Sequence, residues 1–153
     1  MSETKKPSIL FLCTGNSCRS QMAEGWAKAM YRDRYHIYSA GIEAHGLNPN
    51  AVQVMQEAGV DISNQKSQLL AELLEVPLDL VVTVCSHADQ NCPVLPVPCK
   101  KIHVGFDDPP KLAKDATSSE AALDCYRRVR DEIRAFVERL PDELPEDVWT
   151  ADK

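Results

Sequence analysis

The stretch Ser8-Ile-Leu-Phe-Leu-Cys13-Thr-Gly-Asn-Ser-Cys-Arg19-Ser20 decides the fold. Its first five residues form a short apolar run of the kind that predicts a strand buried on both faces. A polar turn with a glycine follows, and residues 17–31 then place apolar side chains at helical intervals. Cys13 is therefore predicted to lie in a turn that joins a buried strand to a helix.

The rest of the chain alternates between strand patterns and helix patterns. Further strands are predicted at residues 36–39, 80–84 and about 101–104, and further helices at residues 48–59, 67–75 and 118–140, with Ser67 as the N-cap of the second. Residues 105–110 are expected to form a rigid loop. The alternation predicts a single α/β domain with a four-stranded parallel sheet flanked by helices on both faces. We expect this domain to span residues 1–140, with residues 141–153 as an acidic C-terminal tail.

The composition is typical of a globular protein, with 44% hydrophobic and 26% charged residues. A net charge of −6 argues against nonspecific nucleic-acid binding, which needs clustered lysine and arginine. No apolar run approaches the roughly 20 residues that span a bilayer, and the apolar stretch after Lys6 lacks the cleavage site of a signal peptide. We therefore expect a cytoplasmic protein without a membrane partner, and we prefer a monomer.

The six cysteines are better interpreted as thiols than as disulfides, because a chain of this length holds a core without covalent staples. Cys13 and Cys85 each follow a predicted strand, as does the loop with Asp107 and Asp108. Ligands of parallel α/β sheets bind beyond the carboxyl ends of the strands. The fold is therefore expected to place these side chains on one rim.

Cys13 and Arg19 enclose five residues, a spacing suited to binding a tetrahedral oxyanion. A loop of this length can turn backbone N–H groups inward at the positive end of the helix. Arg19 would clamp two oxygens of the anion, and the Ser20 hydroxyl would stabilise the Cys13 thiolate. The predicted oxyanion-binding residues are Thr14, Gly15, Asn16, Ser17, Cys18 and Arg19. The alternative is a buried cysteine and a surface arginine, because this spacing also arises by chance.

Four longer motifs favour the anion-binding interpretation: CTGNSCRSQMAEGW from Cys13, YSAGIEAHGLNP from Tyr38, VVTVCSHADQNCPVLP from Val81 and HVGFDDP from His103. With them the chain resembles low-molecular-weight protein tyrosine phosphatases up to about Leu140, and more closely the thioredoxin-coupled arsenate reductases built on that fold. The resemblance implies that Cys13 is the nucleophile, that Arg19 binds the oxyanion and that Asp108 is the general acid. It also implies that no cofactor is bound and that reduced thioredoxin donates electrons.

Cys85 and Cys92 favour a reductase, because hydrolysis needs only one thiolate, an anion cradle and an acid. A cradle for phosphate or sulfate also accepts arsenate, which thiols can reduce. We hypothesise that Cys13 attacks arsenic, that Cys85 attacks the Cys13 sulfur as arsenite leaves, and that Cys92 then attacks Cys85 to give a disulfide for thioredoxin. In a continuous helix the Cα atoms of Cys85 and Cys92 would lie about 10 Å apart, so a disulfide, which spans roughly 4.4–6.8 Å, requires a loop or an unwinding.

Asn16, Glu24 and Ser39 resemble positions that orient the loop and that bind potassium in some reductases of this family. Lys66 and Gln68 stand where those relatives present a hydroxyl and a carboxylate. The Lys66 ammonium would replace the cation, so we expect weak or absent potassium dependence. The alternative is that Lys66 points into solvent, as lysine commonly does.

Two other functions stay open at this point. A phosphatase acting on phosphomonoesters would use the same loop and acid, although residues 107–110 carry no aromatic ring to hold a phenyl group. A nonenzymatic thiol switch would explain Cys85 and Cys92 but would leave the loop without a task. A third interpretation makes these two cysteines mere packing residues.

The remaining cysteines and histidines carry weaker signals. Cys18 is expected to be a structural thiol, with a protective disulfide to Cys13 as the alternative, and Cys99 and Cys125 are expected to be packing or surface residues. His87 and His103 have no metal-ligand spacing with the cysteines. We therefore predict no catalytic metal.

Overall fold

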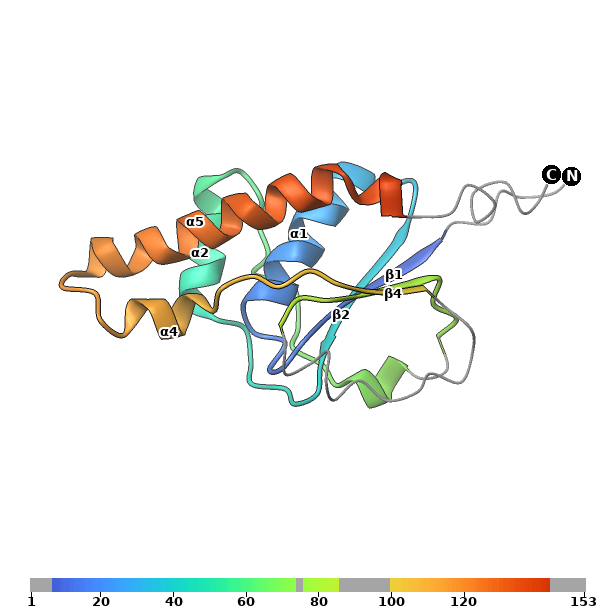
Figure 1. Ribbon diagram of the computed structural model, residues 1–153, viewed down its shortest axis with the longest axis horizontal. Helices are drawn as coiled ribbons and strands as arrows, with labels where there is room; N and C mark the ends of the chain where they lie inside the picture. The colour runs from blue at the N-terminus through green and yellow to red at the C-terminus, as the bar shows by residue number, and fades with distance from the viewer. Residues whose placement is uncertain (1–6, 74–75, 86–99, 144–153) are drawn as a thin grey trace, which may run out of the picture.

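A parallel sheet with the strand order β2-β1-β3-β4 forms the centre of the protein, as the computed structural model shows (Figure 1). The strands are β1 (Ser8–Cys13), β2 (His36–Gly41), β3 (Leu80–Thr83) and β4 (Lys100–His103). The structure describes residues 7–73, 76–85 and 100–143. Strands β1 and β3 are buried along their whole length, as their apolar runs predicted, whereas the lysines of edge strand β4 are exposed.

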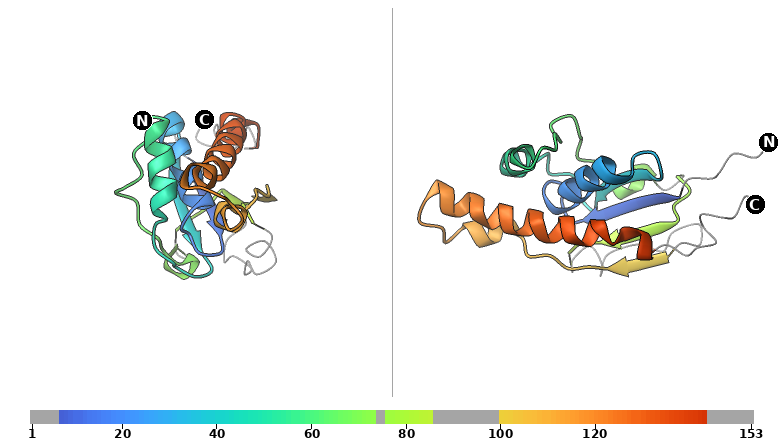
Figure 2. Two further views of the ribbon diagram at one scale, coloured as in Figure 1. Left: turned by 90° about the vertical axis from the view of Figure 1, so that its left-hand side faces the viewer. Right: turned by 90° about the horizontal axis from the view of Figure 1, so that it is seen from above.

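Helices cover both faces of this sheet, as predicted. They are α1 (Arg19–Tyr31), α2 (Pro49–Glu57), α4 (Pro109–Ala113) and α5 (Ser119–Glu138), with the 3₁₀ helices η1 (Leu70–Leu73) and η2 (Leu140–Glu143). Helices α1 and α5 pack against each other on one face, and η1 lies on the other (Figures 1 and 2). The predicted fold class, a four-stranded parallel α/β domain, is confirmed.

Side-chain caps fix where two of the helices begin. The Asn48 side-chain oxygen accepts hydrogen bonds from the N–H groups of Asn50 and Ala51, and Pro49 occupies the first helical position of α2. The Ser118 hydroxyl accepts a hydrogen bond from the N–H group of Ala121 at the start of α5. The buried stripe of α5 packs against the core and consists of Tyr126, Val129, Ile133, Phe136 and Val137.

Two predicted elements were wrong in extent. Of the predicted helix at residues 67–75, the described residues 67–73 contain only the short η1, and Ser67 does not cap it, because its hydroxyl donates to the Gly15 carbonyl at 3.1 Å. The predicted rigid loop at residues 105–110 ends earlier, since α4 begins at Pro109. Proline is well tolerated in the first helical turn, where its missing N–H would have no helical partner.

No helix within residues 7–73, 76–85 and 100–143 is long and apolar enough to cross a membrane. The boundary between domain and tail at residue 140 stays a prediction. Leu140 is fully buried and η2 continues to Glu143, while residues 144–153 lie outside the described part of the chain.

Candidate oxyanion site

Residues 13–19 form a loop between β1 and α1 whose carbonyl groups are held from outside. The Gln21 amide donates to the Asn16 carbonyl oxygen at 3.0 Å. Backbone N–H groups of residues 42–48 hold four other carbonyls through the pairs Ile42 N to Cys13 O at 3.2 Å, Glu43 N to Thr14 O at 2.8 Å, His45 N to Gly15 O at 2.9 Å and Asn48 N to Ser17 O at 2.9 Å. The N–H groups of residues 15–18 donate to no residue that the structure describes. They are therefore available to an anion at the N-terminus of α1.

Asn16 shapes the turn of this loop. Its φ of 48° lies in the left-handed region, which asparagine tolerates better than most residues. The buried side chain donates from Nδ2 to the Ser20 hydroxyl at 2.8 Å and accepts at Oδ1 from the Gln68 N–H at 2.7 Å. Asn16 thus connects the loop both to α1 and to the segment that precedes η1.

Gly41 ends β2 directly behind the loop, and its lack of a side chain permits this approach. A Cβ atom there would lie 2.2 Å from the Glu43 carbonyl oxygen and 2.8 Å from both the Asn16 N and the Thr14 O, all of them backbone atoms. Because backbone cannot swing aside, we expect Gly41→Ala to lower the free energy of unfolding by about 3 kcal/mol. Urea denaturation followed by circular dichroism measures this change.

Gly46→Ala is the matched control for that substitution. Gly46 has a φ of 86° but open space where a Cβ would lie, so only backbone strain of about 1 kcal/mol is expected. Equal losses of stability in the two variants would contradict the proposed steric role of Gly41.

The two cysteines of the loop have different surroundings. The Cys13 sulfur lies 2.9 Å from the Ser20 hydroxyl oxygen, which is the predicted contact. Burial raises the pKa of the Cys18 thiol, and the nearby Cys13 raises it further. Cys18 therefore stays a protonated thiol, and no disulfide joins the two cysteines. This geometry favours Cys13 as the nucleophile of the loop.

Arg19 connects the loop to the segment that carries the predicted acid. Its Nη1 donates to the Phe106 carbonyl oxygen at 2.9 Å, and its Nη2 lies 3.7 Å from Asp108 Oδ1. The Asp108 side chain is 41% exposed, so solvent reaches its carboxyl group. A hollow of about 820 Å³ opens here, and Cys85 also lines it. Cys85 and the loop with Asp107 and Asp108 were predicted to share one rim with Cys13, and they line this hollow beside Thr14, the neighbour of Cys13.

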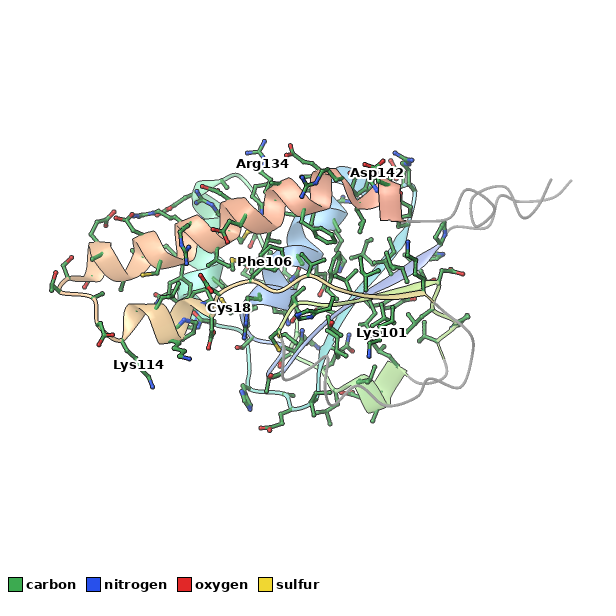
Figure 3. All side chains as sticks on the ribbon, in the orientation of Figure 1. Cys18, Lys101, Phe106, Lys114, Arg134 and Asp142 are labelled. Atoms are coloured by element: carbon green, nitrogen blue, oxygen red, sulfur yellow. The ribbon has the colours of Figure 1, made fainter. Side chains whose placement is uncertain are left out.

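Two contacts fix the segment around Asp108 against α5. Asp107 Oδ2 lies 2.7 Å from an Nη atom of Arg128. The Phe106 ring, labelled in Figure 3, packs against the Phe136 ring of α5 with 6.3 Å between the centroids. The Asp107 partner raises the pKa of Arg128. The segment with the predicted acid is therefore held by α5 as well as by Arg19.

Cys85 lies just beyond the end of β3, where it is buried beside the loop. Its sulfur is 3.2 Å from the Thr14 hydroxyl oxygen. Strands β1 and β3 are direct neighbours with Leu12 opposite Thr83, so the strands that carry Cys13 and Cys85 end side by side. The predicted neighbourhood of the first two thiols follows from this register. Cys92 lies outside the described residues.

Glu24 has a cationic neighbour, and it is not the predicted one. The Lys28 ammonium lies 2.5 Å from Glu24 Oε2, while the Ser39 hydroxyl donates to Glu24 Oε1 and the Gln68 amide donates to the Ser39 carbonyl at 2.8 Å. Lys66 is exposed, and its ammonium forms no ion pair with any described residue. The structure thus matches the alternative in which Lys66 points into solvent, and Lys28 is the lysine that neutralises Glu24.

The other cysteines and histidines that the structure describes form no group that could bind a metal. Cys125 of α5 is partly buried and contacts the Ala121 carbonyl, and His103 contacts the Thr83 hydroxyl at 3.0 Å. His87 and Cys99 lie outside the described residues. Within the described ranges no group of three His, Cys, Asp or Glu side chains could hold a metal ion.

The sequence interpretation missed three supports of the site. Gln65 donates to the Gln21 side chain at 2.8 Å, and Gln21 in turn holds the Asn16 carbonyl. Lys28 was detectable, because a lysine four residues after a glutamate in a helix pairs with it. The pairing of Gln65 with Gln21 spans 44 positions and has no local signal.

The fold and the site together define a class: parallel α/β proteins in which a loop opened by a cysteine presents backbone N–H groups at the N-terminus of a helix. The family model for low molecular weight phosphotyrosine protein phosphatase matches residues 8–150. The chain belongs to this family.

Relatives of this chain include arsenate reductases and phosphatases. An arsenate reductase of Staphylococcus epidermidis is 53% identical to this chain, and the match covers 87% of this chain and 95% of that protein. An arsenate reductase of Bacillus licheniformis is 52% identical, and the match covers 90% of this chain and 96% of that protein. A solved arsenate reductase in its oxidized state superposes with a TM-score of 0.72 at 31% identity, covering 90% of this chain and 98% of the other. A low molecular weight protein tyrosine phosphatase from T. tengcongensis superposes with a TM-score of 0.73 at 27% identity, covering 91% and 100%.

Proposed function

We propose that this protein reduces arsenate to arsenite through Cys13, Cys85 and Cys92, and that reduced thioredoxin regenerates it. The observation that carries the proposal is the second thiol, Cys85, buried beside an oxyanion cradle and 3.2 Å from the Thr14 hydroxyl. A hydrolase of this fold has no use for that thiol. The names of the relatives at more than 50% identity support the same reaction.

The first step places arsenate in the cradle, with its oxygens on the N–H groups of residues 15–18 and on Arg19. The Cys13 thiolate attacks arsenic and forms an As–S bond, while Asp108 protonates the departing oxygen, which leaves as water. The Ser20 hydroxyl, 2.9 Å from the Cys13 sulfur, holds the attacking atom in place. Arsenic is still in its +5 state in this adduct.

The second step moves two electrons. The Cys85 thiolate attacks the Cys13 sulfur, the As–S bonding pair stays on arsenic, and arsenite leaves as a Cys13–Cys85 disulfide forms. Cys92 then attacks Cys85 and releases Cys13 as a thiolate. Thioredoxin reduces the Cys85–Cys92 disulfide by supplying two electrons and two protons. We place this cycle in the cytoplasm because thiol relays of this kind need a reducing compartment. We assign it to a monomer.

A coupled assay tests the proposal. Arsenate should drive NADPH oxidation in the presence of thioredoxin and thioredoxin reductase, with one arsenite formed for each NADPH consumed. Hydrolysis of phenyl phosphate without any arsenite production would contradict the proposal and support the phosphatase alternative.

Phosphomonoester hydrolysis is the second candidate because of one observation. Phe106 and Leu112 line the hollow beside Arg19 and Asp108, so an apolar surface for an aryl group does exist there. The sequence interpretation had placed none in residues 107–110, and Phe106 directly precedes that segment. Side activity on phenyl phosphate is therefore expected with the same nucleophile and acid.

Lys28 is expected to make turnover insensitive to potassium. Its ammonium already neutralises Glu24 behind the loop, so replacing sodium by potassium at constant ionic strength should leave kcat/KM unchanged. Lys28→Met removes the charge, and a partly exposed ion pair worth about 1 kcal/mol predicts roughly a fivefold rise of KM for arsenate. Steady-state kinetics in matched potassium and sodium buffers measure both effects.

Lys66→Met is the control, since the Lys66 ammonium has no ion pair among the described residues. It should leave KM and the cation response at the parental values. A rise of KM in Lys66→Met instead of Lys28→Met would restore the original assignment of the cation to Lys66.

A further inference from the structure

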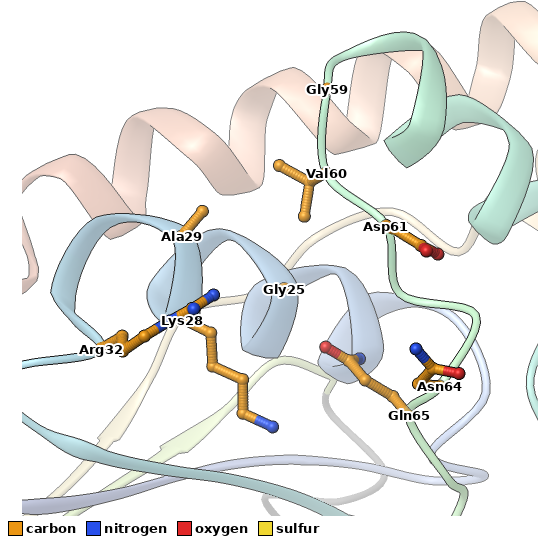
Figure 4. Close-up of a pocket in the computed structure, with 9 residues that line it drawn as sticks. All are labelled: Gly25, Lys28, Ala29, Arg32, Gly59, Val60, Asp61, Asn64 and Gln65. Atoms are coloured by element: carbon orange, nitrogen blue, oxygen red, sulfur yellow. The ribbon is translucent and has the colours of Figure 1, made fainter.

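A second hollow lies behind the anion loop, between one face of α1 and the segment that follows α2 (Figure 4). Its volume is about 410 Å³, and it shares no lining residue with the hollow at Arg19 and Cys85. Lys28 and Ala29 of α1 line it together with Arg32, which directly follows α1, and Asn64 and Gln65 line it from the segment that follows α2. It is too large for a single tetrahedral oxyanion, which fills well under 100 Å³ by comparison with a water's share of about 30 Å³.

The wall of this hollow carries donors that no described residue uses. The Arg32 guanidinium and the Asn64 amide are not hydrogen-bonded or ion-paired to any residue of the described ranges. Lys28 is 44% exposed there and keeps N–H donors beyond the one that meets Glu24. Asp61 also lines the hollow as a carboxylate whose Oδ1 accepts from the N–H and the hydroxyl of Ser63. The wall therefore carries two cations and two amides against one carboxylate.

We propose that this hollow is an effector site for a small dicarboxylate or tricarboxylate. A planar carboxylate matches the fork of the Arg32 guanidinium, and the Lys28 ammonium and the Asn64 amide can meet a second carboxylate across the hollow. The hollow has room for such a ligand, whereas the cradle at Cys13 is shaped for tetrahedral anions. The two sites therefore differ in ligand shape.

Two chains of contacts connect the hollow to the cradle. Lys28 holds Glu24, and Glu24 accepts from Ser39 at the strand next to the loop. Gln65 holds Gln21, whose amide fixes the Asn16 carbonyl. A ligand that takes up Lys28 leaves the negative charge of Glu24 less neutralised behind the cradle. Binding of an oxyanion in the cradle should weaken as a result, and by linkage an oxyanion should weaken binding of the effector.

Inhibition of arsenate turnover by a carboxylate bound in this hollow should saturate. Malonate or citrate should raise KM for arsenate severalfold and leave kcat unchanged, and KM should reach a plateau at high effector concentration. Direct competition for the cradle would instead raise KM linearly without limit. The kinetic test compares the two carboxylates with chloride at constant ionic strength.

Binding itself is read out without turnover, by amide chemical shifts of the parental protein titrated with malonate or citrate. Saturable shifts should centre on Gly25, Gly59 and Val60, with smaller ones in the anion loop. This arm does not depend on the proposed reductase function, so absence of arsenate reduction would leave it interpretable. Shifts centred on residues 13–19, or no saturable shifts at millimolar concentrations, would overturn the inference.

Arg32→Ala is the decisive variant, because Arg32 contacts nothing in the described part of the catalytic loop. It should keep the basal KM and abolish both the shifts and the plateau inhibition. Arg139→Ala is the matched control, since Arg139 is exposed, has no ion pair among the described residues and lies outside the hollow. Retained inhibition in Arg32→Ala, or equal loss in both variants, would show only general charge screening and would refute the site.

Discussion

Cys13→Ser is expected to abolish arsenate turnover, lowering kcat/KM by at least about 10⁴-fold, a loss of the size seen when a covalent nucleophile is removed. A serine hydroxyl is a far weaker nucleophile than a thiolate and cannot form the disulfide that releases arsenite. The cradle uses backbone N–H groups and Arg19, so the variant should still bind sulfate with near-parental affinity. Coupled NADPH oxidation measures the first effect, and isothermal titration with sulfate measures the second.

Cys18→Ala is the control within the same loop. Burial raises the pKa of Cys18 and keeps it protonated, so its sulfur is not expected to take part in the reaction. A modest loss of stability with kcat within a few-fold of the parental value is the expected outcome. Comparable loss of turnover in the two variants would show that the loop had been disrupted and that Cys13 has no special role.

Cys85→Ser should stop the reaction one step later. Without a second thiol no disulfide forms, so arsenite is not released, and multiple turnover should fall by at least about 10³-fold. Arsenic should accumulate on Cys13 as a covalent adduct visible by intact-protein mass spectrometry. Hydrolysis of phenyl phosphate needs only Cys13, Arg19 and Asp108, so this side activity should persist.

Cys125→Ser provides the comparison for Cys85. Cys125 is a partly buried thiol of α5 that contacts a backbone carbonyl, far in sequence from the site. It should turn over arsenate at the parental rate. If Cys85→Ser also kept its rate with thioredoxin, the relay would have to be abandoned and the phosphatase interpretation would gain support.

The sheet was readable from local sequence because its central strands are buried on both faces. The apolar runs at β1 and β3 could be nothing else at that length, and the glycine-containing turn after β1 fixed the place of the anion loop. Helix α4 was missed because Pro109-Pro110 looks like a loop, although proline is equally suited to a first helical turn. Local patterns therefore predicted the core well and the short elements poorly.

The candidate site was predictable where one motif contains its residues, and less so where distant segments meet. Cys13, Arg19 and Ser20 lie within a single motif, and the contact between Cys13 and Ser20 follows from the turn that joins β1 to α1. The support that residues 42–48 give to the loop carbonyls depends on backbone contacts between segments remote in sequence. The cation beside Glu24 was assigned to Lys66 by resemblance, whereas the spacing of four residues to Lys28 carried the physical signal.

A single turnover without any reductant tests the central claim most directly. Mixing the reduced protein with excess arsenate in the absence of thioredoxin should yield one arsenite per protein molecule and consume two thiols. Peptide mapping should then find Cys85 joined to Cys92 and Cys13 again as a thiol. Unchanged thiols with no arsenite, or arsenite formed while Cys85 stays reduced, would contradict the account.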